Sequence, residues 1–187
     1  MFVTNHVLSG VVVGRLFERH PVAAFVVGVG SHLALDMVPH WGCEADRALE
    51  SDLFLRYAKR DGLLGLATAA CAVGAMHRRA RPATVAGIAG AVLLDIDKPA
   101  LHFFGRIPFP DWVQRIHGAV QNESAQGLPN EIVFGLSCAA VDAVIALRGR
   151  RGIPRRGKRE RGNTPVCMLP DRRPPASQPS NAFNRTP

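Results

Sequence analysis

Apolar residues gather into five stretches along the chain, and short polar or proline-containing turns separate them. The stretches are rich in Ala, Val, Leu and Gly and run at about 4–18, 22–38, 62–76, 83–96 and 131–147. Proline ends or begins helices, and Pro21, Pro82 and Pro99 lie between or beside the stretches. We therefore predict an all-α, up-down bundle of about five apolar helices, with connectors at 41–61 and 99–130 that carry amphipathic turns.

Helix length alone does not distinguish a soluble bundle from a membrane bundle. Each stretch has about 15–17 residues, which is short of the roughly 20 that cross a bilayer core. Glycine inside helices is commoner in membranes, where small residues let helices approach closely. Such glycines occur in pairs: Gly10 and Gly14, Gly28 and Gly30, Gly62 and Gly65, Gly87 and Gly90. We therefore expect a polytopic membrane protein.

The net charge of +8 is unevenly divided along the chain. Residues 148–187 carry eleven Arg and Lys residues against Glu160 and Asp171, which leaves residues 1–147 nearly neutral. The basic stretch lacks hydrophobic periodicity and runs into Pro/Ser-rich sequence, a composition typical of disorder. We predict a folded domain at 1–147, which is not expected to bind nucleic acid, and a disordered basic tail at 148–187. The tail could touch anionic lipid or nucleic acid, but we favour a solvated tail that helps to fix membrane orientation.

The arginines predict an orientation in the membrane. If consecutive helices alternate in direction, the end of the first helix, the turn after the third and the end of the fifth share one side. Arginine dominates that side, where Glu18 is the only acid: Arg15, Arg19, Arg78, Arg79, Arg81, Arg148, Arg150 and Arg151. The positive-inside rule makes it cytoplasmic, which predicts a multi-pass protein of the cell inner membrane.

Asp142 lies inside the last apolar stretch. Acidic residues within membranes usually have partners. Arg15 is at a similar depth on the first predicted helix, so we expect a structural ion pair between the two.

The run SHLALDMVPH at 31–40 places three metal-capable side chains four residues apart. Positions four apart share a helix face, so His32 and Asp36 reach one point in space. Pro39 is expected to end the helix, which lets His40 fold back toward the same point. A single histidine on an apolar helix is more often a satisfied core residue, but Asp36 needs a partner in apolar surroundings. The three residues together predict a metal site.

Alternating helices bring further metal-capable residues to the side opposite the arginines. The expected ligands are His6, His32, Asp36, His40, Asp61, Asp95, Asp97 and His117, the last from a short amphipathic helix within 112–123. Asp61 could instead be only a charge that the helix dipole favours. One of Asp95 and Asp97 could lie behind a ligand rather than on the metal.

The number of ligands bears on the metal and on the chemistry. Eight nitrogen and oxygen ligands exceed the four that one tetrahedral zinc takes, so the count suits two ions bridged by a carboxylate. Imidazole with carboxylate suits Zn, with Mn or Fe as alternatives. A catalytic site would use metal-activated water to attack a phosphoester or another ester, with Asp97 or Glu123 as the base.

Several of these elements resemble a family of bacterial proteins, the membrane-bound metal-dependent hydrolases. The resemblance covers about residues 1–147. It rests on Thr4-Asn5-His6, the 31–41 element, Leu94-Asp95-Ile96-Asp97, and His117 with Gln121-Asn122-Glu123. The His-x-x-x-Asp element is also similar to that of the α-helical zinc-dependent phospholipase C and P1 nuclease group, and this likeness implies phosphoester hydrolysis through clustered zinc ions.

Together the residues and the resemblance predict a membrane-bound hydrolase of small-molecule or lipid phosphoesters, with membrane lipid around it. Two alternatives remain: a non-enzymatic membrane protein that binds or transports divalent metal ions, and a structural bundle whose polar helix ends only cap and anchor. A transporter should place its ligands at mid-depth, whereas a hydrolase should gather them at one helix end beside a cleft. The cysteines, Cys43, Cys71, Cys138 and Cys167, form no CxxC pair and imply no disulfide framework.

Overall fold

A computed structural model gives the fold, and it describes residues 1–42, 52–124 and 126–151. These residues are mostly helical and belong to one compact unit, which confirms the prediction of an all-α fold. The tail predicted to be disordered lies almost entirely outside the described residues. Five helices are long: α1 (Val3–Leu16), α2 (Pro21–Asp36), α4 (Asp52–Ala75), α5 (Arg81–Val92) and α8 (Leu128–Arg151).

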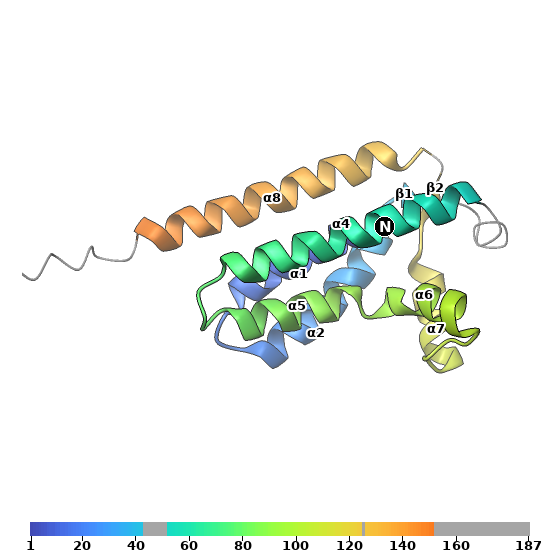
Figure 1. The fold of residues 1–187 in the computed structure, drawn as a ribbon, viewed down its shortest axis with the longest axis horizontal. Helices are drawn as coiled ribbons and strands as arrows, with labels where there is room; N and C mark the ends of the chain where they lie inside the picture. Colours follow the sequence, from blue (N-terminus) through green and yellow to red (C-terminus); the bar gives the residue numbers. More distant parts are fainter. Residues whose placement is uncertain (43–51, 125, 152–187) are drawn as a thin grey trace, which may run out of the picture. The chain divides into compact units, whose positions relative to one another are not determined.

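Short elements lie toward one end of the long helices (Figure 1). η1 (Leu94–Ile96) and α6 (Asp97–Phe104) follow α5, and α7 (Asp111–Val120) comes next. A parallel pair of two-residue strands, β1 (His40–Trp41) and β2 (Glu123–Ser124), joins the chain after α2 to the chain after α7. The predicted connector at 99–130 therefore contains most of α6, all of α7 and the strand β2.

The third long helix begins earlier than predicted. α4 starts at Asp52 rather than near residue 62, so Asp61 lies within the helix instead of at its first turn. The added turns carry Arg56, Lys59 and Arg60 at exposed positions. Charged residues interrupt the apolar ones in this segment, so its pattern is that of an amphipathic turn rather than of the uniformly apolar stretch that follows.

α1 and α5 run antiparallel and in close contact. A Cβ on Gly10 would lie 2.6 Å from the Cα of Ile88, and a Cβ on Gly14 would lie 2.4 Å from the Cα of Thr84. Any residue larger than glycine would force the two backbones apart, because packed helices have no room for an added atom at such distances.

α2 packs on another side of α5 in the same way, but the two helices run parallel. A Cβ on Gly28 would lie 2.5 Å from the carbonyl oxygen of Gly87. Ala24, one turn earlier on α2, packs with Ala83, one turn earlier on α5. α5 thus lies between α1 and α2, with glycine and alanine at both contacts.

α4 runs in the direction of α1, as alternation requires. Thr4 at the start of α1 contacts Asp61, and Val11 further along packs with Met76, which follows α4. The predicted alternation of helices therefore holds among the elements described so far.

α8 also runs parallel to α1, and polar contacts join the two. Asn5 donates a hydrogen bond to a carboxylate oxygen of Glu131 at 2.6 Å. Three turns further on, Arg15 forms an ion pair with Asp142, in which Nη2 also donates to Oδ2 at 3.4 Å. The predicted pairing of Asp142 with Arg15 is confirmed.

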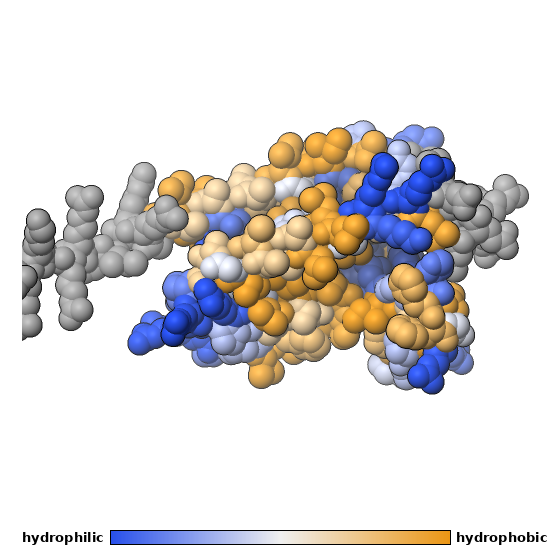
Figure 2. Space-filling model, viewed as in Figure 1, coloured by the Kyte–Doolittle hydropathy of each residue, from blue (hydrophilic) through white to orange (hydrophobic). Residues whose placement is uncertain are grey.

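Large apolar side chains cover much of the outer surface of the helices. Examples on α2, α4 and α8 are Val22, Val26, Leu63, Leu66, Ile132, Val133 and Leu136. Figure 2 shows apolar residues over the middle of the face in view and hydrophilic residues toward its ends. Among the described residues, one helix is long and apolar enough to cross a membrane, which is α8 over Leu128–Arg148. Helix length thus does not support the expectation that the protein is polytopic.

Candidate metal centre

Five of the eight expected ligands converge where the short elements meet the long helices. His6 comes from the start of α1, His32 and Asp36 from the end of α2, Asp95 from η1 and His117 from α7. All five are buried, with 6% exposure or less. Their ligand atoms form two overlapping groups, His6, His32 and Asp36 in one and His32, Asp95 and His117 in the other; the atoms of each group lie within 4.8 Å of one another. We call these five residues the His/Asp cluster.

Asp36 lies at the centre of the His/Asp cluster. Its Oδ2 is 3.1 Å from Nε2 of His32, one helical turn earlier, and 3.3 Å from Nε2 of His117. Its Oδ1 is 3.2 Å from Nε2 of His6 and 3.0 Å from the α-amino group of Met1. One carboxylate therefore faces three imidazole rings.

The backbone of α5 orients His32. Its Nδ1 lies 2.7 Å from the carbonyl oxygen of Ala91, which can only accept a hydrogen bond. The ring proton is therefore on Nδ1, and Nε2 carries a lone pair directed into the cluster. The ring also stacks on His6, with centroids 4.1 Å apart. The close glycine contact between α2 and α5 is what brings His32 to Ala91.

A carboxylate lies behind His117 in a similar way. Nδ1 of His117 faces Oδ2 of Asp97 at 3.6 Å, while Nε2 faces Asp36. Asp97 is held by its own helix start, since its Oδ1 accepts a 2.6 Å hydrogen bond from the backbone N–H of Lys98. Carboxylates in this position typically orient a ligating histidine and raise its basicity. Of the Asp95 and Asp97 pair, Asp95 belongs to one of the groups of converging ligand atoms, and Asp97 lies behind His117.

The His/Asp cluster suits a cation at its centre. Nε2 of His32 and Nε2 of His117 are 3.1 Å apart, and both face the acceptor atoms of Asp36. Nε2 of His6 lies 3.2 Å from Oδ1 of Asp36 and 3.6 Å from Oδ2 of Asp95, but neither this nitrogen nor Oδ2 of Asp95 has a partner with hydrogen-bond geometry among the described residues. Lone pairs this close repel one another unless a proton or a metal ion lies between them. Imidazole and carboxylate are donors that Zn, Mn and Fe accept.

The pKa values of two cluster residues reflect the opposite charges that surround each of them. Burial disfavours the charged form of His117, but hydrogen bonds with Asp36 and Asp97 outweigh it and raise the pKa of His117 to about 9. Burial would raise the pKa of Asp95, but the positive charges of Lys98 and nearby histidines lower it to about 2. Asp95 is therefore ionised, and the cluster without metal retains a proton on His117 at neutral pH.

Asp61 has a structural role and lies outside both groups of converging ligand atoms. Its Oδ2 accepts a 2.6 Å hydrogen bond from the backbone N–H of Val3. Its Oδ1 accepts a 2.6 Å hydrogen bond from the hydroxyl group of Thr4 and a 3.2 Å bond from the backbone N–H of Thr4. The carboxylate satisfies N–H groups in the first turn of α1, which have no partner within the helix. Asp61 thus caps α1, a neighbouring helix, rather than α4, the helix to which it belongs.

His40 also lies outside both groups. Pro39 follows the end of α2 as expected, but the chain then enters β1, where His40 is paired with Glu123 of β2. Nδ1 of His40 lies 2.9 Å from the carbonyl oxygen of Val38. The ring is buried, and its Nε2 has no hydrogen-bond partner among the described residues. The strand pairing, which the sequence does not reveal, decides where this ring lies.

Glu131 and Gln121 are polar residues near the cluster that the sequence did not mark as candidate ligands. Glu131, in the first turn of α8, accepts hydrogen bonds from Asn5 and from the backbone N–H groups of Phe2 and Trp41. It thereby joins α8 to α1 and β1. The side-chain nitrogen of Gln121 lies 3.1 Å from Nε2 of His117. Glu131 has only the signal of an acidic residue near a helix end, which is too common to select, and Gln121 was marked only by the family resemblance.

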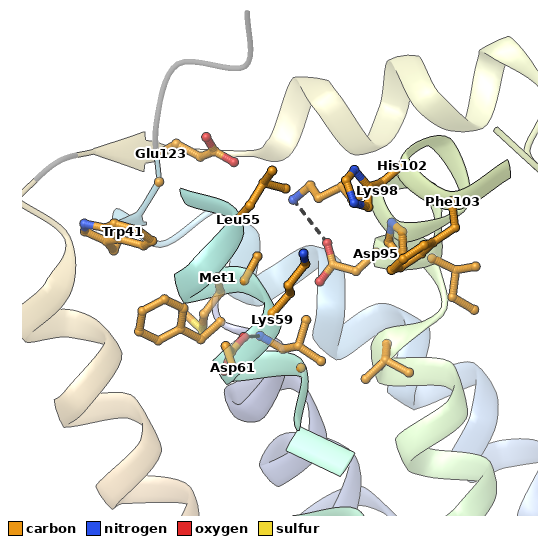
Figure 3. Close-up of a pocket in the computed structure, with 18 residues that line it drawn as sticks. Met1, Trp41, Leu55, Lys59, Asp61, Asp95, Lys98, His102, Phe103 and Glu123 are labelled. Atoms are coloured by element: carbon orange, nitrogen blue, oxygen red, sulfur yellow. Dashed lines mark hydrogen bonds and ion pairs between the residues drawn. The ribbon is translucent and has the colours of Figure 1, made fainter. Parts of the chain in front are cut away.

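A cavity of about 410 Å³ lies beside the cluster, and Asp95 forms part of its wall. Figure 3 shows Lys59 and Lys98 directed toward the carboxylate of Asp95. The Nζ of Lys98 lies 3.3 Å from Oδ1 of Asp95. Burial lowers the pKa of Lys98, but Asp95, Glu123 and Asp97 outweigh it and raise that pKa above its usual value. The cluster is therefore connected to a cavity that contains fixed positive charge.

The His/Asp cluster, the contacts behind its rings and the adjoining cavity all belong to one end of the helices. Comparisons of the chain with protein families, with curated proteins and with solved structures give no match. Evidence about function therefore comes from the geometry of these residues alone.

Proposed function

We propose that this protein is a membrane-bound, metal-dependent hydrolase of phosphoesters. The observation that carries the proposal is the convergence of three imidazole Nε2 atoms on one buried carboxylate, that of Asp36, beside a ligand-sized cavity. Metal sites that only stabilise a fold are usually closed by their protein ligands, whereas catalytic sites keep access for water or substrate. The position of Asp95 in both the cluster and the cavity wall gives such access.

One divalent ion fits the His/Asp cluster better than two. The two groups of converging atoms share His32, and its Nδ1 is already hydrogen-bonded to Ala91. A single nitrogen lone pair binds a single ion, so the groups are two descriptions of one site. Nε2 of His6, His32 and His117 would hold the ion with oxygens of Asp36 and Asp95. Zn is the expected metal, with Mn or Fe as alternatives, because each accepts this mixture of donors.

The residues around the cluster supply the other requirements of ester hydrolysis. A divalent ion in such a site polarises a phosphoryl oxygen and lowers the pKa of water to near 7. Ala91 and Asp97 hold the rings of His32 and His117 in their binding orientation. Lys98 provides positive charge at the cavity, where the negative charge of a phosphoester would lie.

The exposed surface supports the proposed membrane location. Among the described residues, 25 large hydrophobic side chains are exposed, whereas 11 hydrophobic residues are buried. A soluble monomer rarely exposes so much apolar surface. The Arg15–Asp142 pair between α1 and α8 is of the kind that stabilises charges in an apolar environment. The arginines near the ends of α1 and α4 and at the start of α5 support an orientation in which those ends lie at the cytoplasmic face of the inner membrane and the cluster lies on the opposite side.

Metal analysis of detergent-purified protein tests the site. We expect about one ion per chain in the wild type and at least a tenfold loss in His32→Ala and Asp36→Asn, because each change removes a ligand. His77→Ala is the matched control, since His77 is exposed and pairs only with Glu18. Equal metal content in all four proteins would contradict the proposal.

Turnover then separates a hydrolase from a carrier. Wild type and His77→Ala should hydrolyse bis(4-nitrophenyl) phosphate, and the two ligand variants should not. Metal bound by the wild type without turnover of any phosphodiester would favour the alternative, a non-enzymatic protein that binds or transports divalent ions.

A further inference from the structure

The cavity beside the His/Asp cluster has an apolar wall. Side chains from at least five separate elements or segments form it, among them Phe2, Trp41, Leu55, Val92 and Phe103. Its volume, about 410 Å³, is in the range of sites that enclose a small ligand. A wall of this kind is stabilised by contact with hydrocarbon rather than with water.

Positive charge lies at the part of the cavity nearest the cluster. Figure 3 shows the ammonium groups of Lys59, from α4, and Lys98, from α6, directed toward Asp95. Asp61 also belongs to the wall, but Val3 and Thr4 already occupy both of its oxygens. Lys98 pairs with one oxygen of Asp95 at 3.3 Å, which leaves two of its three N–H donors, and Lys59 has no ion pair with another described residue. Both lysines can therefore donate to a ligand that carries negative charge.

The surroundings of the cavity are apolar as well. Phe103, in the wall, is 67% exposed, and its neighbour Phe104 is 76% exposed. Ile96, also in the wall, is 43% exposed. A ligand that enters past these residues comes from an apolar environment, such as the acyl region of a bilayer.

We propose that this cavity binds the hydrocarbon chain of a phosphate-bearing amphiphile, with Lys59 and Lys98 binding the phosphate group next to Asp95. The inference rests on the proposed function, because the His/Asp cluster is what would act on that phosphate. A lysine ammonium group is a compact charge suited to phosphate oxygens. A water-soluble phosphoester would leave the apolar wall without a partner.

The reaction on such a ligand is a simple hydrolysis. A bond forms between a water oxygen and phosphorus, and the bond between phosphorus and the leaving oxygen breaks. One proton of the water passes to the leaving oxygen, so the products are a phosphate ester with one substituent fewer and an alcohol. No oxidant or reductant takes part.

Binding is measured first, by fluorescence of Trp41 in a Trp112→Phe background, which leaves one tryptophan in the cavity wall. The probe is decylphosphonate, which water does not cleave. We expect it to bind at least about tenfold more tightly than methylphosphonate, decanoate or decyltrimethylammonium. Equal binding of methylphosphonate would overturn the role of the chain, and equal binding of decanoate or of the cation would overturn the preference for phosphate.

Two variants test the assigned residues. Gly62 is in the wall and a Cβ there meets nothing within 4 Å, so Gly62→Leu fills the cavity without a clash at the backbone. It should weaken decylphosphonate and leave methylphosphonate unchanged. Gly74→Leu is its control, since a Cβ at Gly74 on the same helix is also unhindered and lies outside the cavity. Lys59→Gln should weaken both phosphonates, with Arg60→Gln as the control.

Normal decylphosphonate binding in either folded variant would overturn the inference, because Gly62→Leu tests the site of the chain and Lys59→Gln tests the site of the phosphate. Circular dichroism and metal content of each variant show that it is folded. Because the two changes act on different parts of the ligand, failure of one variant to fold leaves the other decisive.

Turnover distinguishes this inference from the proposed function. The substrates are 4-nitrophenyl phosphodiesters whose second ester is methyl or decyl. Faster turnover of the decyl ester supports both the hydrolase activity and the role of the cavity. Equal turnover of the two esters supports the hydrolase activity and overturns the role of the cavity. Chain-dependent binding without any turnover retains the ligand class and overturns the proposed function.

Discussion

Nε2 of His32 and Nε2 of His117 lie 3.1 Å apart, although the two residues come from helices far apart in the sequence. Each ring has its other nitrogen directed at a fixed acceptor, the carbonyl oxygen of Ala91 or the carboxylate of Asp97. The two nitrogens are thus aimed at the same point by contacts behind them. Two neutral rings would repel in this arrangement. The state of the site therefore depends on whether a proton or a metal ion lies between the two nitrogens.

Metal affinity should therefore rise with pH. The pKa of His117 is raised to about 9 in the metal-free protein, so His117 carries a proton at pH 7 that must leave before Nε2 can bind an ion. Between pH 6 and 8 we expect the affinity to increase about tenfold per pH unit, with release of about one proton per ion. Calorimetry in buffers of different ionisation enthalpy measures both quantities. An affinity independent of pH would contradict a protonated His117.

The metal-free protein should show the opposite trend in stability. The pKa of His117 is higher in the folded protein than its ordinary value of 6.5, so the folded state holds the extra proton between about pH 6.5 and 9. Stability from this group is complete below that range and is lost as pH rises through it. Thermal unfolding of chelator-treated protein at pH 6.5 and 9 measures the difference, and added metal should abolish or reverse it.

Asp97→Asn should weaken metal binding without removing a ligand. Asparagine keeps an oxygen for the N–H of Lys98 but removes the negative charge that faces Nδ1 of His117. Loss of a carboxylate behind a ligating histidine typically costs about 10- to 100-fold in metal affinity. Asp111→Asn makes the same chemical change on α7 at an exposed position and should have little effect. The metal dissociation constants of both variants test this role. An unchanged dissociation constant for Asp97→Asn would show that Asp97 does not contribute to metal binding.

Much of the cluster was predictable because it depends on two regularities of helices. The four-residue spacing of His32 and Asp36 places them on one face, and alternation of helix direction brings His6 and Asp95 to the same end. His117 followed from an amphipathic turn in the connector. The same alternation predicted the pairing of Arg15 with Asp142, which is confirmed.

The residues that lie elsewhere depend on contacts that have no local signal. Asp61 was expected to begin a helix, but nine residues, 52–60, in which charged residues interrupt the apolar ones, extend α4 before it, and its carboxylate caps α1 instead. His40 was expected to fold back onto the metal, but the short pairing of β1 with β2 fixes it first. The cavity is formed by side chains from several elements, so no single stretch of sequence predicts it.

Asp61→Ala should lower stability and leave metal content unchanged. The variant removes three hydrogen bonds to the first turn of α1, and loss of a helix cap costs about 0.5–2 kcal/mol. Arg60→Ala, at the preceding exposed position of α4, is the control. Unfolding in detergent and metal analysis are measured on the same samples. A loss of metal with unchanged stability would instead place Asp61 among the ligands.

Substitution by alanine should have different effects on stability at Gly28 and Gly30 of α2, and only the change at Gly28 should also alter metal affinity. A Cβ at Gly28 would lie 2.5 Å from the carbonyl oxygen of Gly87, whereas a Cβ at Gly30 meets nothing within 4 Å. Gly28→Ala must push α2 away from α5 and should cost about 1–3 kcal/mol of stability. Gly30→Ala should be neutral or stabilise by up to about 1 kcal/mol, because alanine favours a helix more than glycine does.

The displacement in Gly28→Ala has a consequence for His32, four residues further along α2. Its Nδ1 hydrogen bond to Ala91 spans the same contact between α2 and α5, so movement of α2 should lengthen that bond and release the orientation of the ring. We therefore expect Gly28→Ala to lower metal affinity as well as stability, and Gly30→Ala to change neither for the worse. Thermal unfolding and metal titration of both variants measure this coupling. A destabilised Gly28→Ala protein with unchanged metal affinity would show that the packing of α5 does not orient His32.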